Sequence, residues 1–184
     1  MANQGTNKRY FGNDFRSHSL ASSLHEKLIE TRKENLKNIF AHYEGNDHRL
    51  EYVKSINDID FIDDSHANSV KAVWYALESM TKPVTWIMNI GDIDEVTEDL
   101  LEAVDNKVER IVIQGVYNSE IIDFFSGLGK EVSFAMNLED AVRVAFYSSV
   151  KGNVVLFSPG VSGRGMYVSY RERGEKFKNA IAQL

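Results

Sequence analysis

Apolar residues recur at helical spacings in some parts of the chain and as short, strand-like runs in others. The change between these two patterns divides the chain into predicted elements. Within residues 21–46, apolar side chains fall at helical spacings, and Ser22 or Ser23 can cap a helix there. The polar residues 44–47 end this pattern. We therefore predict a linker helix within 21–46. Its apolar stripe consists of Leu24, Leu28, Leu36, Ile39 and Phe40.

The first twenty residues show neither pattern. They are polar, rich in Asn, Gly, Arg and Ser, and their large apolar groups are Tyr10, Phe11 and Phe15. We predict a flexible arm over residues 1–20, and the alternative is an arm that docks through these aromatic side chains.

Beyond residue 47, short apolar runs alternate with helical stripes. A strand over 48–55 and a return strand from Asp60 are joined by a turn at Asn57-Asp58. Further strands are predicted at 84–89, 110–114, 131–135 and 153–157. Helices are predicted over about 66–80, 95–106, 118–128, 138–150 and 169–183.

Two of these strands carry apolar residues on both faces. They are Ile111-Val112-Ile113 and Val154-Val155-Leu156-Phe157. Strands of this kind are buried on both sides, which is typical of a parallel sheet covered by helices. We predict an α/β domain over 47–184, with a doubly wound, mostly parallel, Rossmann-like sheet and helices on both faces. In such a sheet, ligands bind beyond the carboxyl ends of the strands.

Composition excludes several classes of protein. The 184 residues carry a formal net charge of −6 and no cysteine, so general nucleic-acid binding, disulfides and thiolate metal sites are not expected. No apolar run reaches the ~18 residues of a membrane span, and the N-terminus has no apolar signal region. We expect a cytoplasmic protein with neither nucleic acid nor membrane as its partner.

The loop after the return strand holds the densest polar chemistry. Asp63, Asp64, Ser65 and His66 follow one another at a strand-to-helix junction. The group can form a site for a ribose, phosphate or carboxylate. The alternative is that Asp64 or Ser65 only caps the helix, with His66 solvated in its first turn. We expect no metal there, because three neighbouring residues on a turn rarely converge on one ion.

A second loop, 160–165, is rich in glycine and precedes the last helix. It contains Ser162 and Arg164, so its amides and guanidinium can cradle an anion. The loop matches none of the standard phosphate-binding patterns, and a plain flexible connection explains it equally well.

Four stretches, taken in order, resemble the C-terminal, amino-acid-binding domain of the Mur ligases. These are ATP-dependent, amide-forming enzymes of peptidoglycan precursor synthesis, and the D-glutamate-adding branch is the most similar. The resemblance covers about four-fifths of the chain. The stretches are His48–Glu51 for H-R-x-E, Phe61–Ser69 for the "INDSKATN" loop, Trp74–Met80 for the next helix, and Ser158–Phe177 for the closing "SPACASFD…RGxxF" segment.

The resemblance implies a role for several residues. Arg49 would reach the phosphates of ATP, and Asp63 or Asp64 would face the nucleotide ribose, since either aspartate fits one register of the family loop. The carboxylates of the incoming amino acid, D-glutamate, would be held at positions that match the family's ligands. These positions are His66, Asn68, Ser162 and Tyr170.

The ligand loops depart from the family pattern. His66 stands where the family has lysine, and Asn68 stands where it has threonine. The glycine-rich loop at 89–94 lacks the family's lysine, and one residue is inserted before Tyr170. Arg164 could restore a lost positive charge. The departures indicate altered or lost ligand binding on a retained fold.

The family binds ATP and magnesium through a central domain with a P-loop, and no G-K-[ST] sequence occurs in this chain. We expect no cofactor on the chain alone and no activity without that domain.

One hypothesis is an amino-acid-binding domain that works with a partner or a longer enzyme. The other is a stand-alone pseudo-ligase that binds a metabolite, a nucleotide, a Mur ligase or another cell-wall protein. The initial Met1 and the arm favour a complete gene product. A third hypothesis is an independent enzyme that uses Asp63 and His66 as its acid–base pair.

Overall fold

The computed structural model describes residues 47–90, 92–160 and 167–184, together with Lys27 and Thr31. The predicted arm and linker helix lie outside the described residues, except that Lys27 and Thr31 are helical and exposed. The elements below belong to one compact unit, Tyr43–Leu184. Within the described part of the chain, no helix is both long and apolar enough to cross a membrane.

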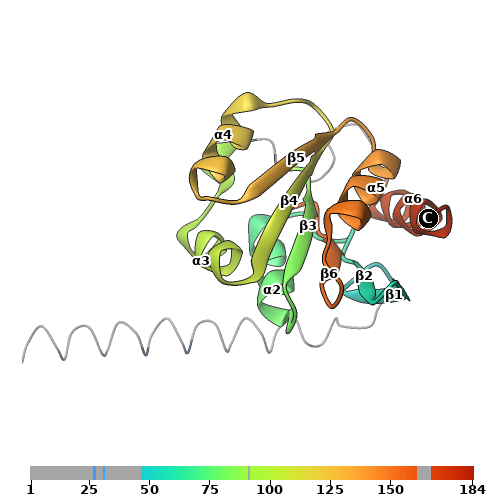
Figure 1. The fold of residues 1–184 in the computed structure, drawn as a ribbon. Helices are drawn as coiled ribbons and strands as arrows, with labels where there is room; N and C mark the ends of the chain where they lie inside the picture. The colour runs from blue at the N-terminus through green and yellow to red at the C-terminus, as the bar shows by residue number, and fades with distance from the viewer. Residues whose placement is uncertain (1–26, 28–30, 32–46, 91, 161–166) are drawn as a thin grey trace, which may run out of the picture. The chain divides into compact units, whose positions relative to one another are not determined.

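A six-stranded sheet forms the centre of this unit (Figure 1), in the order β1-β2-β6-β3-β4-β5. Strands β2, β6, β3, β4 and β5 run parallel, and β1 pairs antiparallel with β2 at one edge. The predicted fold class is therefore confirmed. The strands are β1 (Glu51–Ile56), β2 (Ile59–Asp63), β3 (Val84–Met88), β4 (Val108–Gln114), β5 (Glu131–Ala135) and β6 (Val154–Phe157).

The hairpin between β1 and β2 turns at the predicted place. Asn57 and Asp58 both have left-handed backbone conformations, with φ of 54° and 64°. Two successive positive φ values are typical of the type I′ turn, whose twist matches that of the strands it joins. Asn and Asp tolerate this conformation better than most residues do, so the local sequence is enough to place the turn.

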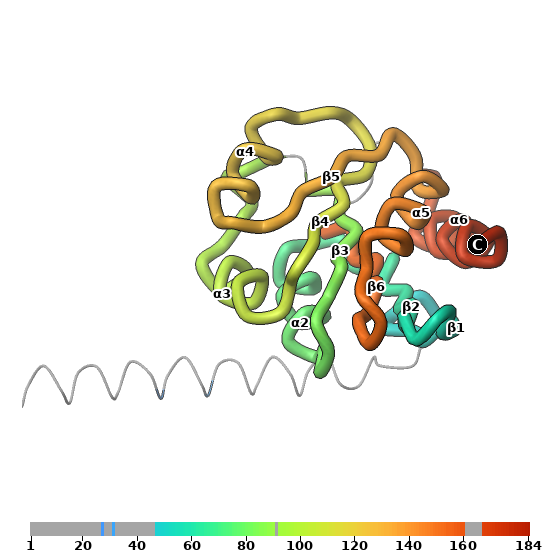
Figure 2. Tube along the Cα trace, in the orientation of Figure 1, coloured from blue at the N-terminus to red at the C-terminus, as the bar shows by residue number. Residues whose placement is uncertain are grey.

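Helices cover both faces of the sheet, as Figures 1 and 2 show, with α2, α3 and α4 on one side and α5 and α6 on the other. Strand residues reach both layers because successive side chains point to opposite faces. The ring of Trp86 packs edge-on against Phe125 of α4, and Phe157 packs against Phe177 of α6. The elements are α2 (Val70–Ser79), η1 (Ile93–Glu95), α3 (Glu98–Lys107), α4 (Ser119–Gly127), α5 (Leu138–Ser148) and α6 (Tyr170–Ala182).

The start of α2 differs from the prediction. The helix begins at Val70, where the Ser69 side chain accepts a hydrogen bond from the Ala72 amide. Asp64 and Ser65 therefore do not cap it, and His66 is not in its first turn. The residues between β2 and α2 form a loop whose polar groups bond to distant parts of the chain instead. This outcome removes the purely structural interpretation of the Asp63–His66 segment as a helix cap.

Gly174 determines how closely α6 approaches this loop. A Cβ atom there would overlap Nδ1 of His48 and lie 2.6 Å from the Oγ of Ser65. Both neighbours are buried, so neither can move away without disturbing the loop. Glycine is required at this position by packing rather than by its backbone angles.

We expect Gly174→Ala to lower the free energy of unfolding by about 1–3 kcal/mol, because overpacking a tight contact forces its neighbours apart. Gly127→Ala is the matched control, since it also lies in a helix but a Cβ there meets nothing within 4 Å. The control should be neutral or slightly stabilising. Urea denaturation of both variants measures the difference, and equal stabilities would contradict the packing argument.

Candidate functional site

The loop after β2 is fixed between two segments that are far apart in sequence. The Asp64 amide donates to the carbonyl of Phe157 at the end of β6, over 2.8 Å, and the His66 amide donates to the carbonyl of His48, over 3.0 Å. The loop therefore joins the residues before β1 to the carboxyl end of β6. This is the edge of the sheet at which a ligand site is expected.

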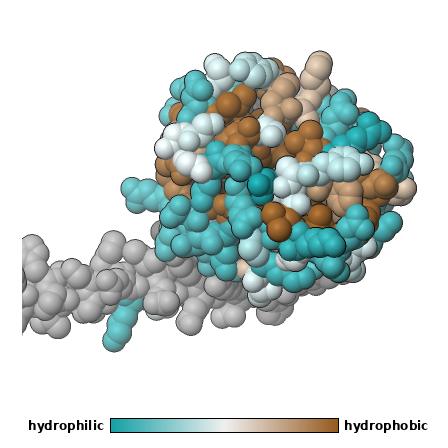
Figure 3. Space-filling view, viewed as in Figure 1, coloured by the Kyte–Doolittle hydropathy of each residue, from teal (hydrophilic) through white to brown (hydrophobic). Residues whose placement is uncertain are grey.

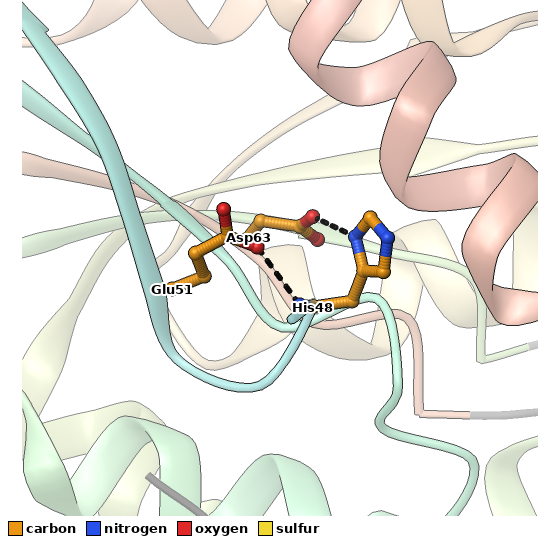
Figure 4. A group of neighbouring side chains, drawn as sticks. All are labelled: His48, Glu51 and Asp63. Atoms are coloured by element: carbon orange, nitrogen blue, oxygen red, sulfur yellow. Dashed lines mark hydrogen bonds and ion pairs between the residues drawn. The ribbon is translucent and has the colours of Figure 1, made fainter. Parts of the chain in front are cut away.

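Asp63 is fully buried, and its carboxylate is used inside the protein. One oxygen lies 2.7 Å from Nδ1 of His48, and the other accepts the Ser65 amide over 2.9 Å. Figure 4 shows the His48 ring pointing at this carboxylate. Because both oxygens are engaged, Asp63 orders the loop and His48.

Glu51 completes a group with His48 and Asp63 in which one possible metal-ligating atom of each lies within 4.8 Å of the others. The contacts present account for this group without a metal. Glu51 accepts the His48 amide over 2.8 Å, as Figure 4 also shows, and its other oxygen lies 2.8 Å from Nζ of Lys178. The ammonium group of Lys178 supplies the positive charge that a cation would bring.

Asp64 is the more open of the two aspartates, although it too is buried. The hydroxyl of Ser158 donates to its Oδ2 over 2.7 Å. Burial raises the pKa of Asp64 to about 7, against the lowering effects of Ser158, the Leu50 amide and the charge of Arg49. The carboxyl group therefore exchanges a proton near neutral pH and can either donate or accept a hydrogen bond.

His66 and Arg49 meet directly beside Asp64. Nη2 of Arg49 lies 3.2 Å from Nε2 of His66, and the imidazole packs on the ring of Tyr170 at 4.3 Å between centroids. Burial, and then the positive charge of Arg49, lower the pKa of His66. A neutral imidazole follows at neutral pH, with Nε2 accepting from the guanidinium.

Arg173, on the first turn of α6, ties that helix to the loop. It is buried, and its Nε and Nη2 both donate to the carbonyl of Ser65. The Ser65 hydroxyl donates in turn to the carbonyl of Tyr170 over 3.2 Å. These bonds place a buried guanidinium at the amino end of α6, where the helix dipole also favours anions.

A cavity of about 190 Å³ opens at this point. Apart from Val168, the side chains around it are polar, aromatic or cationic, and none of them is a carboxylate. Tyr167 contributes a neutral hydroxyl, since burial raises its pKa to about 12. The cavity is lined by His66, Asn68, Tyr167, Val168, Ser169, Tyr170 and Arg173.

A larger hollow of about 730 Å³ lies at the opposite end of the sheet, before β3, β4 and β5. Arg110 pairs there with Glu131 at 2.7 Å and Lys130 with Asp105 at 3.5 Å, and Lys107 donates to the carbonyl of Met80. These cations are therefore engaged within the protein. The carboxyl end of the sheet therefore remains the candidate site.

The structure brings most of the predicted site residues together. Arg49, Asp64 and His66 are neighbours, Asp63 lies behind them in the interior, and Asn68 and Tyr170 line the cavity. Ser162 and Arg164 lie outside the described residues. The sequence analysis assigned no role to His48, Tyr167 or Arg173, although all three stand within the segments that carry the resemblance.

Two curated proteins that are similar to this chain carry the same name. The UDP-N-acetylmuramoylalanine–D-glutamate ligase of Christiangramia forsetii is 36% identical over 166 residues, which are 90% of this chain and 37% of that protein. The ligase of the same name from Bacteroides fragilis is 35% identical over 167 residues, 90% of this chain and 38% of that protein. The chain thus spans less than two-fifths of the length of these curated relatives.

Solved structures agree at the level of the fold. A murein peptide ligase from Psychrobacter arcticus superimposes with a TM-score of 0.51 at 12% identity, over 75% of this chain and 30% of that chain. No family model matches the chain.

The raised pKa of Asp64 predicts a specific pH dependence of stability. The folded protein holds a proton on Asp64 between pH 3.8, the ordinary value, and about 7, so the free energy of unfolding falls as the pH rises through this window. We expect Asp64→Asn to remove this fall, on the order of 2 kcal/mol between pH 5 and pH 8. Urea denaturation at four pH values measures it, with the exposed Asp123→Asn as control. Parallel profiles of wild type and Asp64→Asn would contradict the prediction.

Proposed function

Because the chain belongs to the Mur ligase family, as a homologue of part of UDP-N-acetylmuramoylalanine–D-glutamate ligase, we propose that it is an amino-acid-binding module of an ATP-dependent, amide-forming ligase. In this proposal the cavity at the start of α6 holds the carboxylate end of a small amino acid, D-glutamate in the first instance. Asp64 and Arg49 face the nucleotide. The P-loop and the magnesium ligands come from polypeptide beyond this chain.

The observation that carries the proposal is the chemistry of the 190 Å³ cavity. Its lining contains one buried guanidinium, Arg173, together with neutral donors and two tyrosines. No carboxylate side chain is part of the lining. A site of this size and sign suits a small anion, and the start of α6 adds a favourable dipole. Asn68 and Tyr170, at two of the family's amino-acid-binding positions, line it.

The nucleotide role is assigned to Asp64 rather than Asp63. Asp63 is fully buried, and each of its oxygens already has a partner, His48 or the Ser65 amide, so a ribose cannot reach it without a rearrangement of the loop. Asp64 is slightly more exposed and keeps a carboxyl group that can donate or accept. Arg49 lies beside it, at the position that reaches phosphates in the family.

The surface around the site supports a covering partner. Val116 and Tyr117 after β4, Met136 after β5, and Val168 before α6 are all largely exposed. Figure 3 shows hydrophobic atoms interspersed among hydrophilic ones on one face of the molecule. Exposed apolar residues at the carboxyl ends of the strands suit a second protein surface there, such as the ATP-binding domain of a ligase.

A second candidate function is a non-catalytic relative that binds a metabolite or a ligase and regulates cell-wall synthesis. The neutral state of His66 favours it, since the family places a permanently charged lysine there. Loss of that charge weakens the hold on a second carboxylate. The two candidates differ in whether a ligase reaction depends on this chain.

Titration calorimetry and thermal unfolding with D-glutamate test the amino-acid site. At a hundred times its dissociation constant, a ligand adds ~2.7 kcal/mol of stability, which raises the unfolding midpoint by roughly 5–10 °C for a chain of this size. We expect His66→Ala to lose this rise and the exposed Lys71→Ala to keep it. Absence of binding to the wild type, with or without ATP–magnesium, would count against the amino-acid site.

Reconstitution with an ATP-binding Mur ligase domain separates the two candidates. We expect phosphate release from ATP, in the presence of UDP-N-acetylmuramoylalanine and D-glutamate, to require this chain and to fall at least 100-fold in Arg49→Ala. The control variant is Lys71→Ala. Binding of D-glutamate without any turnover would instead favour the non-catalytic candidate.

A further inference from the structure

The contact between Arg49 and His66 depends on the protonation state of the histidine. A guanidinium has five N–H donors and no acceptor, so the 3.2 Å contact is a hydrogen bond only while Nε2 of His66 carries no proton. Protonation of Nε2 would set two positive donors against each other.

The charges around His66 come from every element packed against it. From the segment before β1 come Arg49 and His48, from the loop after β2 come Asp63 and Asp64, and from α6 comes Arg173. Arg49 contacts the imidazole directly, and its charge also acts on Asp64. Burial and the cations together keep the imidazole neutral.

The position of Arg171 can be compared with that of Arg49. Its guanidinium lies 5.3 Å from the centroid of the Tyr170 ring on which His66 packs. It is a cation of the same kind near the same ring, whereas Arg49 contacts Nε2 of His66 itself.

We propose, on the basis of the function proposed above, that His66 is a conditional cation: a phosphate group captures Arg49, and the released imidazole takes up a proton and binds the carboxylate of the amino acid. His66 then replaces the family's lysine only when the nucleotide is present. It is the residue that makes amino-acid binding depend on the polyphosphate.

The exchange is balanced by one proton. The Arg49–His66 hydrogen bond breaks, the guanidinium donates to phosphate oxygens instead, and Nε2 takes one proton from solvent. The protonated Nε2 donates to the ligand carboxylate. Because coupling between two binding equilibria is reciprocal, the amino acid must strengthen polyphosphate binding by the same factor.

NMR titration of the His66 ring tests the first half of this exchange, with inorganic tripolyphosphate as the probe. We expect saturating tripolyphosphate to move the His66 titration midpoint upward by about half to one pH unit. Arg49→Ala should raise the midpoint without any probe and abolish the response to it. Arg171→Ala is the matched control and should keep both the midpoint and the response.

Calorimetry tests the second half. We expect D-glutamate to bind at least fivefold more tightly with tripolyphosphate than without it at pH 7, with proton uptake seen as a buffer-dependent heat. In His66→Lys, whose charge is permanent, the affinity should no longer depend on the probe.

Each contrary result has a separate meaning. A His66 midpoint that does not move with tripolyphosphate, or that still moves in Arg49→Ala, overturns the conditional cation. Equal affinity for D-glutamate with and without the probe overturns the coupling while leaving the proposed amino-acid site intact. If D-glutamate binds in neither condition, the proposed function fails, and the histidine titration still decides whether Arg49 controls His66.

Discussion

The buried contact between Arg173 and the carbonyl of Ser65 is the interaction on which the site depends. It joins the first turn of α6 to the loop after β2, which are more than a hundred residues apart in sequence. Burying a guanidinium is costly unless its donors are satisfied, and here a backbone carbonyl accepts from two of them. The same contact places a positive charge beside the cavity and brings Tyr170 against His66. Without it, the cavity would have neither its shape nor its charge.

The electrostatics of the site follow from crowding in a small volume. Asp63 and Asp64 are adjacent and both buried, but the groups that contact them differ. Asp63 has the His48 ring and the Ser65 amide as close partners, whereas the Ser158 hydroxyl, the Leu50 amide and the charge of Arg49 act on Asp64. Burial nevertheless dominates at Asp64 and raises its pKa. A strongly shifted pKa such as that of Asp64 is common at functional sites.

Much of this fold could be predicted from the sequence, because its signals are local. The apolar strands β4 and β6 and the Asn57-Asp58 turn specify their structure within a few residues. The start of α2 could not be placed, because Asp64, Ser65 and Ser69 are all good caps and tertiary bonds decide among them. The roles of His48 and Arg173 could not be derived from periodicity either. Each is defined by a partner distant in the chain, and helical spacing says only that Arg173 falls on the inner face of α6.

A histidine at position 66, where the family pattern has a lysine, changes the electrostatic interaction with Arg49. A lysine ammonium there would stand against the guanidinium as a second permanent cation, with both partly removed from water. Neutral His66 instead accepts a hydrogen bond from Arg49, so an attraction replaces the repulsion between the two side chains. The same bond must be broken before a carboxylate can be held, so part of the binding free energy is used to rearrange the pair. The residues that fix the fold can tolerate this exchange because neither Arg49 nor His66 belongs to the packed core. Gly174 fixes the packing of α6 against the loop, whereas Arg49 and His66 lie outside the core, so their charges can change without a change in that packing.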